Sequence, residues 1–233
     1  QALALQCWKQ LRRRKVLVVR TGELAREERE GLLRSSLILE IVKSWYLVCP
    51  PKNGKSVEQA WQDAFWPFCG QYLNNRFGSD WCLSADNSLL LHAGNWSVPT
   101  LTLVCAHGAN NRMVRLPFGT SMFNCNQSLP NHQDIVIRNG LRMYDLEAAF
   151  VDASPAFFAT NPHDALVVLE QLRGRKPVMD CLTSGKNLSS VGRLIGALRS
   201  VGAEETARDI HTAMKTAGHT VRVIDPFTHN SPC

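Results

Sequence analysis

The spacing of hydrophobic residues changes once between Thr21 and Val48. Thr21 is a favoured N-cap residue, acidic residues follow it where a helix dipole stabilises them, and apolar side chains then recur at helical spacing. Residues 37–42 and 45–48 are rich in β-branched and aromatic residues and flank the polar pair Lys43-Ser44. The stretch therefore predicts a helix that starts at Thr21, buries Leu32 and Leu33, and leads directly into a β-hairpin.

The residues on either side of this stretch give it the outline of a separate module. Residues 2–15 place Leu5, Trp8 and Leu11 on one helical face and end in basic residues, and residues 16–19 form a short apolar strand or turn. A helix, a connector, a second helix and a hairpin in this order are typical of a winged helix-turn-helix. Residues 50–56, PPKNGKS, then break the pattern and predict a linker.

The rest of the chain alternates helical and strand-like patterns. Residues 57–77 predict a helix that Pro67 kinks or divides, and Ser84 predicts the cap of a short helix that ends near residue 93. The expected strands are residues 100–105, 113–116, 135–137, 141–144 and 221–224, with an Asn139-Gly140 hairpin turn between the third and the fourth. The expected C-terminal helices are residues 145–152, 162–173, 188–201 and 203–217.

These patterns together predict an α+β fold class. We expect a winged helix-turn-helix in residues 1–50, a small mixed sheet with helices in residues 56–144, and a helical part in residues 145–233. The second and third parts form either one body or two.

Positive charge is concentrated at the N-terminal end. The net charge of the chain is +6, and the first 50 residues hold ten basic side chains against five acidic ones, which amounts to +5. This asymmetry favours a polyanionic partner, whereas the alternative is a solvated basic face. The chain has no apolar run of the ~20 residues that a membrane span needs. Its eight cysteines form no C-x-x-C pair, which is typical of reduced thiols in a cytoplasmic protein.

No catalytic, cofactor-binding or metal-binding motif stands out. Asn53-Gly54-Lys55-Ser56 lacks the first glycine of a phosphate-binding loop, because Cys49 occupies that position, and Pro50 and Pro51 remove backbone donors. The seven histidines form no H-E-x-x-H, and no G-x-S-x-G elbow is present. We therefore expect no enzyme active site, no cofactor and no metal.

The candidate site is a set of basic residues on the predicted module. In a winged helix the second helix enters the major groove of DNA and the wing contacts the backbone, and arginine can fork to guanine or to phosphate. Glu23, Glu27, Glu28 and Glu30 share the predicted recognition helix and would repel phosphates if they faced DNA; alternatively they face residues 12–15 inside a packing module. The predicted DNA-binding residues are Arg12, Arg13, Arg14, Arg26, Arg29, Arg34 and Lys43.

Four segments carry a resemblance to known families: SADNSLLLHAG, VRLPFGTSMF, IVIRNGLRMYDLEAAFV and VGRLIGALRSVGAEETARDIHTAMKTAGHTVRVIDPF. All four resemble the region ahead of the catalytic domain in bacterial Fic-family proteins. The N-terminal helix and hairpin, the small sheet and the RNGLRMYDL segment are also similar to winged-helix antitoxins of the AbiEi type, which act as transcriptional repressors. The Fic motif H-P-F-x-x-G-N-G-R is absent, so the resemblance transfers no catalytic residue.

The sequence thus predicts a cytoplasmic DNA-binding regulator of antitoxin type. Its expected partner is double-stranded DNA, in the first instance its own promoter, and a toxin or a Fic catalytic domain is a further expected partner. A homodimer fits this function because operators are palindromic. The alternative is the non-catalytic regulatory or docking region of a Fic-type protein adenylyltransferase.

Overall fold

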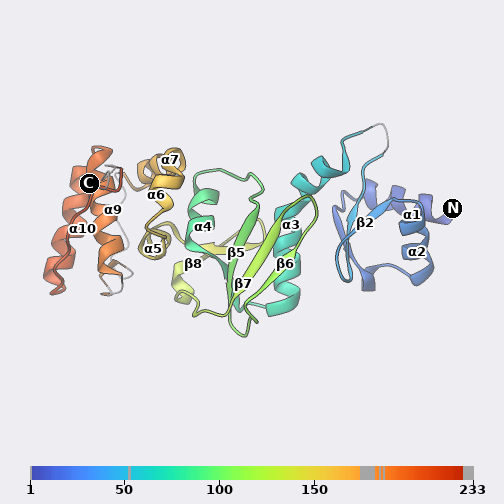
Figure 1. Ribbon diagram of the computed structural model, residues 1–233, viewed down its shortest axis with the longest axis horizontal. Helices are drawn as coiled ribbons and strands as arrows, with labels where there is room; N and C mark the ends of the chain where they lie inside the picture. Colours follow the sequence, from blue (N-terminus) through green and yellow to red (C-terminus); the bar gives the residue numbers. More distant parts are fainter. Residues whose placement is uncertain (1, 52–53, 174–181, 184, 186, 228–233) are drawn as a thin grey trace. The chain divides into compact units, whose positions relative to one another are not determined.

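The described residues form helices and three small sheets, which confirms the predicted α+β class (Figure 1). The computed structural model describes residues 2–51, 54–173, 182–183, 185 and 187–227. Contacts divide the chain into two compact units. Unit 1 comprises residues 1–81, 97–127 and 138–141, and unit 2 comprises residues 82–96, 128–137 and 142–233. The predicted three-part division into residues 1–50, 56–144 and 145–233 stays a prediction.

Unit 1 begins with an N-terminal module of residues 2–51. Helix α1 packs on α2, because Gly31 lets the backbone of α2 approach the Cβ of Ala4. The three strands form an antiparallel sheet in the order β1-β3-β2, in which Val19 pairs with Tyr46 and Leu39 with Leu47. The elements of the module are α1 (Ala2–Arg13), β1 (Val18–Arg20), η1 (Thr21–Glu23), α2 (Arg26–Arg34), β2 (Ile38–Val42) and β3 (Trp45–Val48).

Three local expectations for this module are wrong. Thr21 begins a short 3-10 turn, and α2 starts only at Arg26, because Leu24 adopts an extended conformation (φ −126°) between them. Leu33 is exposed, since Leu32 is the α2 side chain that points into the core. In α1 the buried face runs through Ala4 and Leu11, which leaves Leu5 exposed. The hairpin predicted from residues 37–42 and 45–48 is confirmed, with strands at Ile38–Val42 and Trp45–Val48.

The second layer of unit 1 is a long helix against a mixed sheet. Helix α3 (Val57–Phe77) is capped by Ser56, whose hydroxyl accepts the Gln59 N–H, and it passes Pro67 without dividing. The sheet order is β4-β5-β7-β6, with β5 and β7 parallel and β6 antiparallel to β7. Strands β4 and β7 were not predicted. The four strands are β4 (Trp81–Leu83), β5 (Leu101–Ala106), β6 (Arg112–Arg115) and β7 (Ser121–Cys125).

Unit 2 is mostly helical and has its own apolar core, to which Phe150, Phe157, Leu169 and Ile195 contribute. The predicted hairpin turn at Asn139-Gly140, which belongs to unit 1, is confirmed, since Asn139 (φ 51°) and Gly140 (φ 77°) both adopt the left-handed conformation that a tight turn requires. The remaining elements are α4 (Ala85–His92), η2 (His132–Asp134), β8 (Ile135–Arg138), β9 (Leu141–Tyr144), α5 (Leu146–Asp152), α6 (Phe157–Thr160), α7 (Pro162–Leu172), α9 (Leu188–Ser200) and α10 (Glu204–Thr216).

The predicted strand at residues 221–224 is absent, because this extended segment lies along a helix and not beside another strand. Gly192 and Gly196 stand one turn apart on α9, and a Cβ on either would meet the backbone of residues 222–225. The Ile224 N–H donates to the Gly192 carbonyl at 3.2 Å. The glycines of the GRLIGALR sequence therefore have a packing role.

Candidate nucleic-acid interface

The first group of predicted contact residues is held at the end of α1. Arg12 and Arg13 occupy its last turn, Arg14 and Lys15 follow, and all four side chains are exposed. Lys15 takes the left-handed conformation (φ 56°), and the N–H groups of Lys15 and Val16 donate to the carbonyls of Arg12 and Leu11. This is the hydrogen-bond pattern of a Schellman helix end, so the backbone that carries the cluster is fixed. The negative end of the helix dipole also favours cations here, which is a structural role independent of any ligand.

The second group lies on α2. Arg26 and Arg34 are exposed, whereas Arg29 is half-buried. The Nε of Arg26 lies 2.8 Å from the Oε1 of Glu30, one turn later, and this ion pair lowers the pKa of Glu30, to which the charges of Arg29 and Arg34 also contribute. The exposed side of α2 therefore carries cations with two carboxylates among them, Glu30 in its ion pair with Arg26 and the exposed Glu27.

Two of the acids on this stretch have local structural roles. The Glu23 carboxylate accepts the Arg20 N–H at 2.8 Å, and the Glu28 carboxylate accepts the Ala25 N–H at 3.0 Å. Both acids thus satisfy backbone donors at the start of a helical turn. In the part of the chain that the structure describes, no ion pair joins the acids of residues 23–30 to the basic residues 12–15. The alternative of a charge-paired packing module therefore gains no support from the described residues.

The last predicted contact is at the turn of the hairpin. Lys43 is exposed between β2 and β3, next to Ser44, which adopts the left-handed conformation (φ 72°). The Ser44 carbonyl accepts the Thr21 N–H at 2.9 Å. This bond ties the tip of the hairpin to the start of η1, so Lys43 has a defined place on the module.

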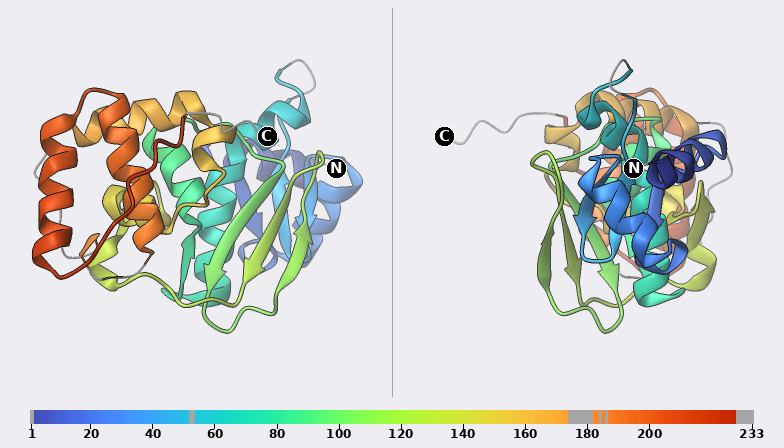
Figure 2. Two further views of the ribbon diagram at one scale, coloured as in Figure 1. Left: turned by 60° about the vertical axis from the view of Figure 1, so that its left-hand side comes forward. Right: turned by 90° about the vertical axis from the view of Figure 1, so that its right-hand side faces the viewer.

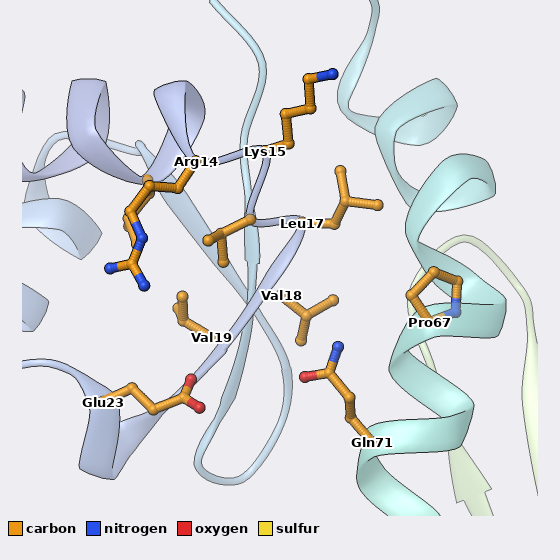
Figure 3. Close-up of a pocket in the computed structure, with 10 residues that line it drawn as sticks. Arg14, Lys15, Leu17, Val18, Val19, Glu23, Pro67 and Gln71 are labelled. Atoms are coloured by element: carbon orange, nitrogen blue, oxygen red, sulfur yellow. The ribbon is translucent and has the colours of Figure 1, made fainter. Parts of the chain in front are cut away.

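A groove beside β1 is a feature that the sequence did not predict. It encloses about 580 Å³ and is lined by Arg14, Lys15, residues 16–19, Glu23, Pro67 and Gln71. In Figure 3, Arg14 and Glu23 lie on one side of β1, and Pro67 and Gln71 extend from α3 on the other. Sequence spacing gives no sign of this groove, because its two walls are separated by about 50 residues of chain.

The described residues offer no metal centre and no activated thiol. No group of three or more metal-ligating side chains occurs among them. Burial raises the pKa of the Cys49 and Cys69 thiols, so both are protonated near neutral pH. Cys181 and Cys233 lie outside the described residues, as do Lys52 and Asn53 of the predicted linker. Within the described chain, no helix is long and apolar enough to cross a membrane.

No protein-family model matches the chain, and neither does any curated protein. Among solved structures, the crystal structure of the Rv2827c protein from Mycobacterium tuberculosis is similar, with a TM-score of 0.55 and 16% sequence identity. The match covers 96% of this chain and 84% of that chain. At this identity the similarity concerns the fold alone, and it extends over both units of the chain.

Proposed function

We propose that the protein is a DNA-binding transcriptional regulator of antitoxin type, whose N-terminal module is a winged helix. In this assignment α2 is the recognition helix, η1 stands in place of the first helix of the pair, and the β2–β3 turn is the wing. The order of the elements supports the assignment, because the β2–β3 hairpin follows α2 directly along the chain and β1 pairs with β3 to complete the sheet.

The observation that carries the proposal is the distribution of charge on this module. Six of the seven predicted contact residues are exposed, and the seventh, Arg29, is half-buried. They occupy the end of α1, the length of α2 and the hairpin turn, which are the positions from which a winged helix reaches phosphates, the major groove and the backbone. Of the four acids that would oppose DNA, Glu23 and Glu28 accept hydrogen bonds from backbone N–H groups and Glu30 pairs with Arg26, whereas Glu27 is exposed.

The antitoxin class and the promoter target rest on the resemblance of the sequence to AbiEi-type proteins. A toxin partner and a homodimer on a palindromic operator follow from the same class. The alternative function, a regulatory region ahead of a Fic catalytic domain, rests on residues 191–227. The first function is preferred because the exposed basic residues of the N-terminal module support it.

The direct test is binding of the full chain to a duplex from its own promoter, measured by fluorescence anisotropy against a scrambled duplex of equal length. We expect the promoter duplex to bind at least 10³-fold more tightly, as specific sites do. Arg34→Ala and Lys43→Ala should each weaken binding, by removing a contact from α2 and from the wing. Arg208→Ala, at an exposed position of unit 2, is the matched control and should bind as the wild type does. Equal affinity for both duplexes would overturn the assignment as a specific regulator.

A further inference from the structure

The mixed sheet of unit 1 has one face that α3 covers and one that it does not. On the inner face, Val104, Ala106 and Met122 are fully buried, and the indole N–H of Trp61 on α3 donates to the Thr120 hydroxyl at 3.1 Å. Figure 1 shows α3 behind β5, β7 and β6. In the second view of Figure 2 these strands are seen edge-on, and α3 again lies on that one side of the sheet. Side chains alternate between the faces of a strand, so the residues between the buried ones point to the outer face.

The outer face carries exposed apolar side chains on adjacent strands. Leu103 of β5 pairs with Phe123 of β7, which pairs in turn with Met113 of β6, so the three form one row across the sheet. Leu101 lies two residues before Leu103 on the same face. Leu101, Leu103 and Met113 are 40%, 38% and 52% exposed. A contiguous exposed apolar row of this kind is typical of an interaction surface.

The outer face carries a basic residue beside this row and no acidic one from its own strands. Residues 97–127 contain no aspartate or glutamate, and of their two arginines Arg112 pairs with the buried Asn124 and so belongs to the inner face. Arg115 pairs with Ser121, which pairs with Leu101, so Arg115 belongs to the outer face at the end of the apolar row. Methionine, phenylalanine and arginine are enriched at protein–protein interfaces, whereas lysine and acidic residues are depleted there. The composition of this face follows that bias.

The loop between β6 and β7 adds an exposed aromatic residue to the same end of the sheet. Phe118 is 43% exposed and adopts the left-handed conformation (φ 54°). A bulky side chain in this conformation is strained, and such strain is concentrated at binding sites. The loop is fixed by the Leu116 N–H, which donates to the Thr120 carbonyl at 2.9 Å.

We propose that the outer face of the β5–β7–β6 sheet is a docking surface for an acidic amphipathic helix of a partner protein. Its apolar side would cover Leu101, Leu103 and Met113, and its carboxylates would lie against Arg115. This function is separate from DNA binding by the N-terminal module. A second copy of the chain is a poor occupant, since it would bring another Arg115 and no acid from residues 97–127. Single-stranded nucleic acid is a poorer occupant, because successive bases stack on several aromatic rings, whereas the exposed residues of the row are aliphatic and Phe118 adds one ring at its end.

The test uses the full chain and two fluorescent peptides of about 18 residues with leucine on one helical face. The remaining positions are glutamate in the first peptide and lysine in the second. We expect the glutamate peptide to bind at least tenfold more tightly than the lysine peptide. Leu103→Asp should weaken this binding at least tenfold. Leu166→Asp, on α7 in unit 2, changes a leucine of similar exposure (43%) and should have no effect.

Charge reversal keeps the test independent of any effect of Leu103→Asp on folding. Arg115 is exposed, so Arg115→Glu leaves the core intact, and its circular dichroism spectrum and melting temperature should match those of the wild type. The variant should lose affinity for the glutamate peptide and gain it for the lysine peptide, each by about fivefold. The proposal is overturned by equal binding of both peptides, by no binding at millimolar concentration, or by a peptide preference that Arg115→Glu does not change.

Discussion

The close approach of a chain segment to α9 gives a sharp prediction about stability. The backbone of residues 222–225 lies directly against Gly192 and Gly196. A Cβ at position 196 would fall on the carbonyl oxygen of Ile224 and would lie 2.9 Å from the amide nitrogen of Asp225. These are backbone atoms, so Gly196→Ala can be accommodated only if the segment moves away from the helix.

The expected cost follows from what that movement breaks. The segment would lose the hydrogen bond from the Ile224 N–H to the Gly192 carbonyl, which contributes about 1 kcal/mol. It would also loosen the burial of Val221 and the edge-to-face contact of Phe227 with Phe158 (ring centroids 5.7 Å apart), together about 2 kcal/mol. Alanine is a better helix former than glycine by about 1 kcal/mol. The net loss is therefore about 2 kcal/mol.

Urea unfolding followed by far-ultraviolet circular dichroism measures this loss in the helical unit. For slopes of about 2 kcal/mol per molar urea, the unfolding midpoint of Gly196→Ala should fall by about 1 M. Ser189→Ala is the control on the same helix. Its position is exposed, so its change in stability should stay within about 0.5 kcal/mol. A Gly196→Ala protein as stable as the wild type would refute the packing of residues 222–225 on α9.

Three further predictions concern single side chains. Glu30→Gln releases Arg26 from its ion pair and should strengthen DNA binding several-fold in low salt. The control is Glu170→Gln, which frees Arg173 in unit 2 and should leave DNA binding unchanged. Equal effects of the two substitutions on DNA affinity would contradict the α2 interface. Asp145 caps α5, and its pKa is raised from 3.8 to about 6. The main cause is burial of the carboxyl group, and the nearby charges of Glu147 and Asp134 add to it. The folded state therefore holds this proton more tightly than the unfolded state, so its contribution to stability is lost as pH rises from about 4 to about 6. Asp145→Asn keeps the hydrogen bond from the Ala148 N–H and should be about 1 kcal/mol more stable than the wild type at pH 7, after allowance for solvent screening. At pH 4 the variant should show no gain in stability. Urea unfolding midpoints of both proteins at pH 4 and pH 7 test this prediction. Trp8→Phe removes the indole N–H that donates to the Cys49 carbonyl at 2.9 Å and should cost about 1 kcal/mol by thermal unfolding, whereas an unchanged melting temperature would contradict this bond.

The elements with strong local signals could be predicted from the sequence. Ser84 caps α4, Asn139-Gly140 forms the hairpin turn, and Gly202 and Gly218 end α9 and α10, because each of these signals acts within a few residues. Strand β7 escaped prediction, since its central residues Met122 and Phe123 gain their places only by pairing with β5, about 20 residues earlier. The segment 221–224 was misassigned for the same reason, because its partner is a helix face that no local pattern reveals.

The candidate interface shows the same limit. The sequence placed Arg12, Arg26 and Lys43 on a helix end, a helix and a turn, and the structure has them there. It could not show that Glu23 and Glu28 bind backbone donors while Glu30 binds Arg26, since these choices depend on where α2 begins. The groove beside β1 and the apolar outer face of the sheet both require residues from distant segments.

The salt dependence of binding to the promoter duplex tests the central claim most directly. Each neutralised phosphate contributes about −0.9 to the slope of log K against log salt concentration, so contacts from the seven predicted residues give a slope of about −6. Replacing Arg12, Arg13 and Arg14 together by alanine should make the slope shallower by about 2.7. The matched control is the triple replacement of Arg173, Arg208 and Lys215, which are exposed in unit 2, and it should leave the slope unchanged. A slope near zero, or the same slope after loss of Arg12–Arg14, would contradict DNA recognition by the N-terminal module.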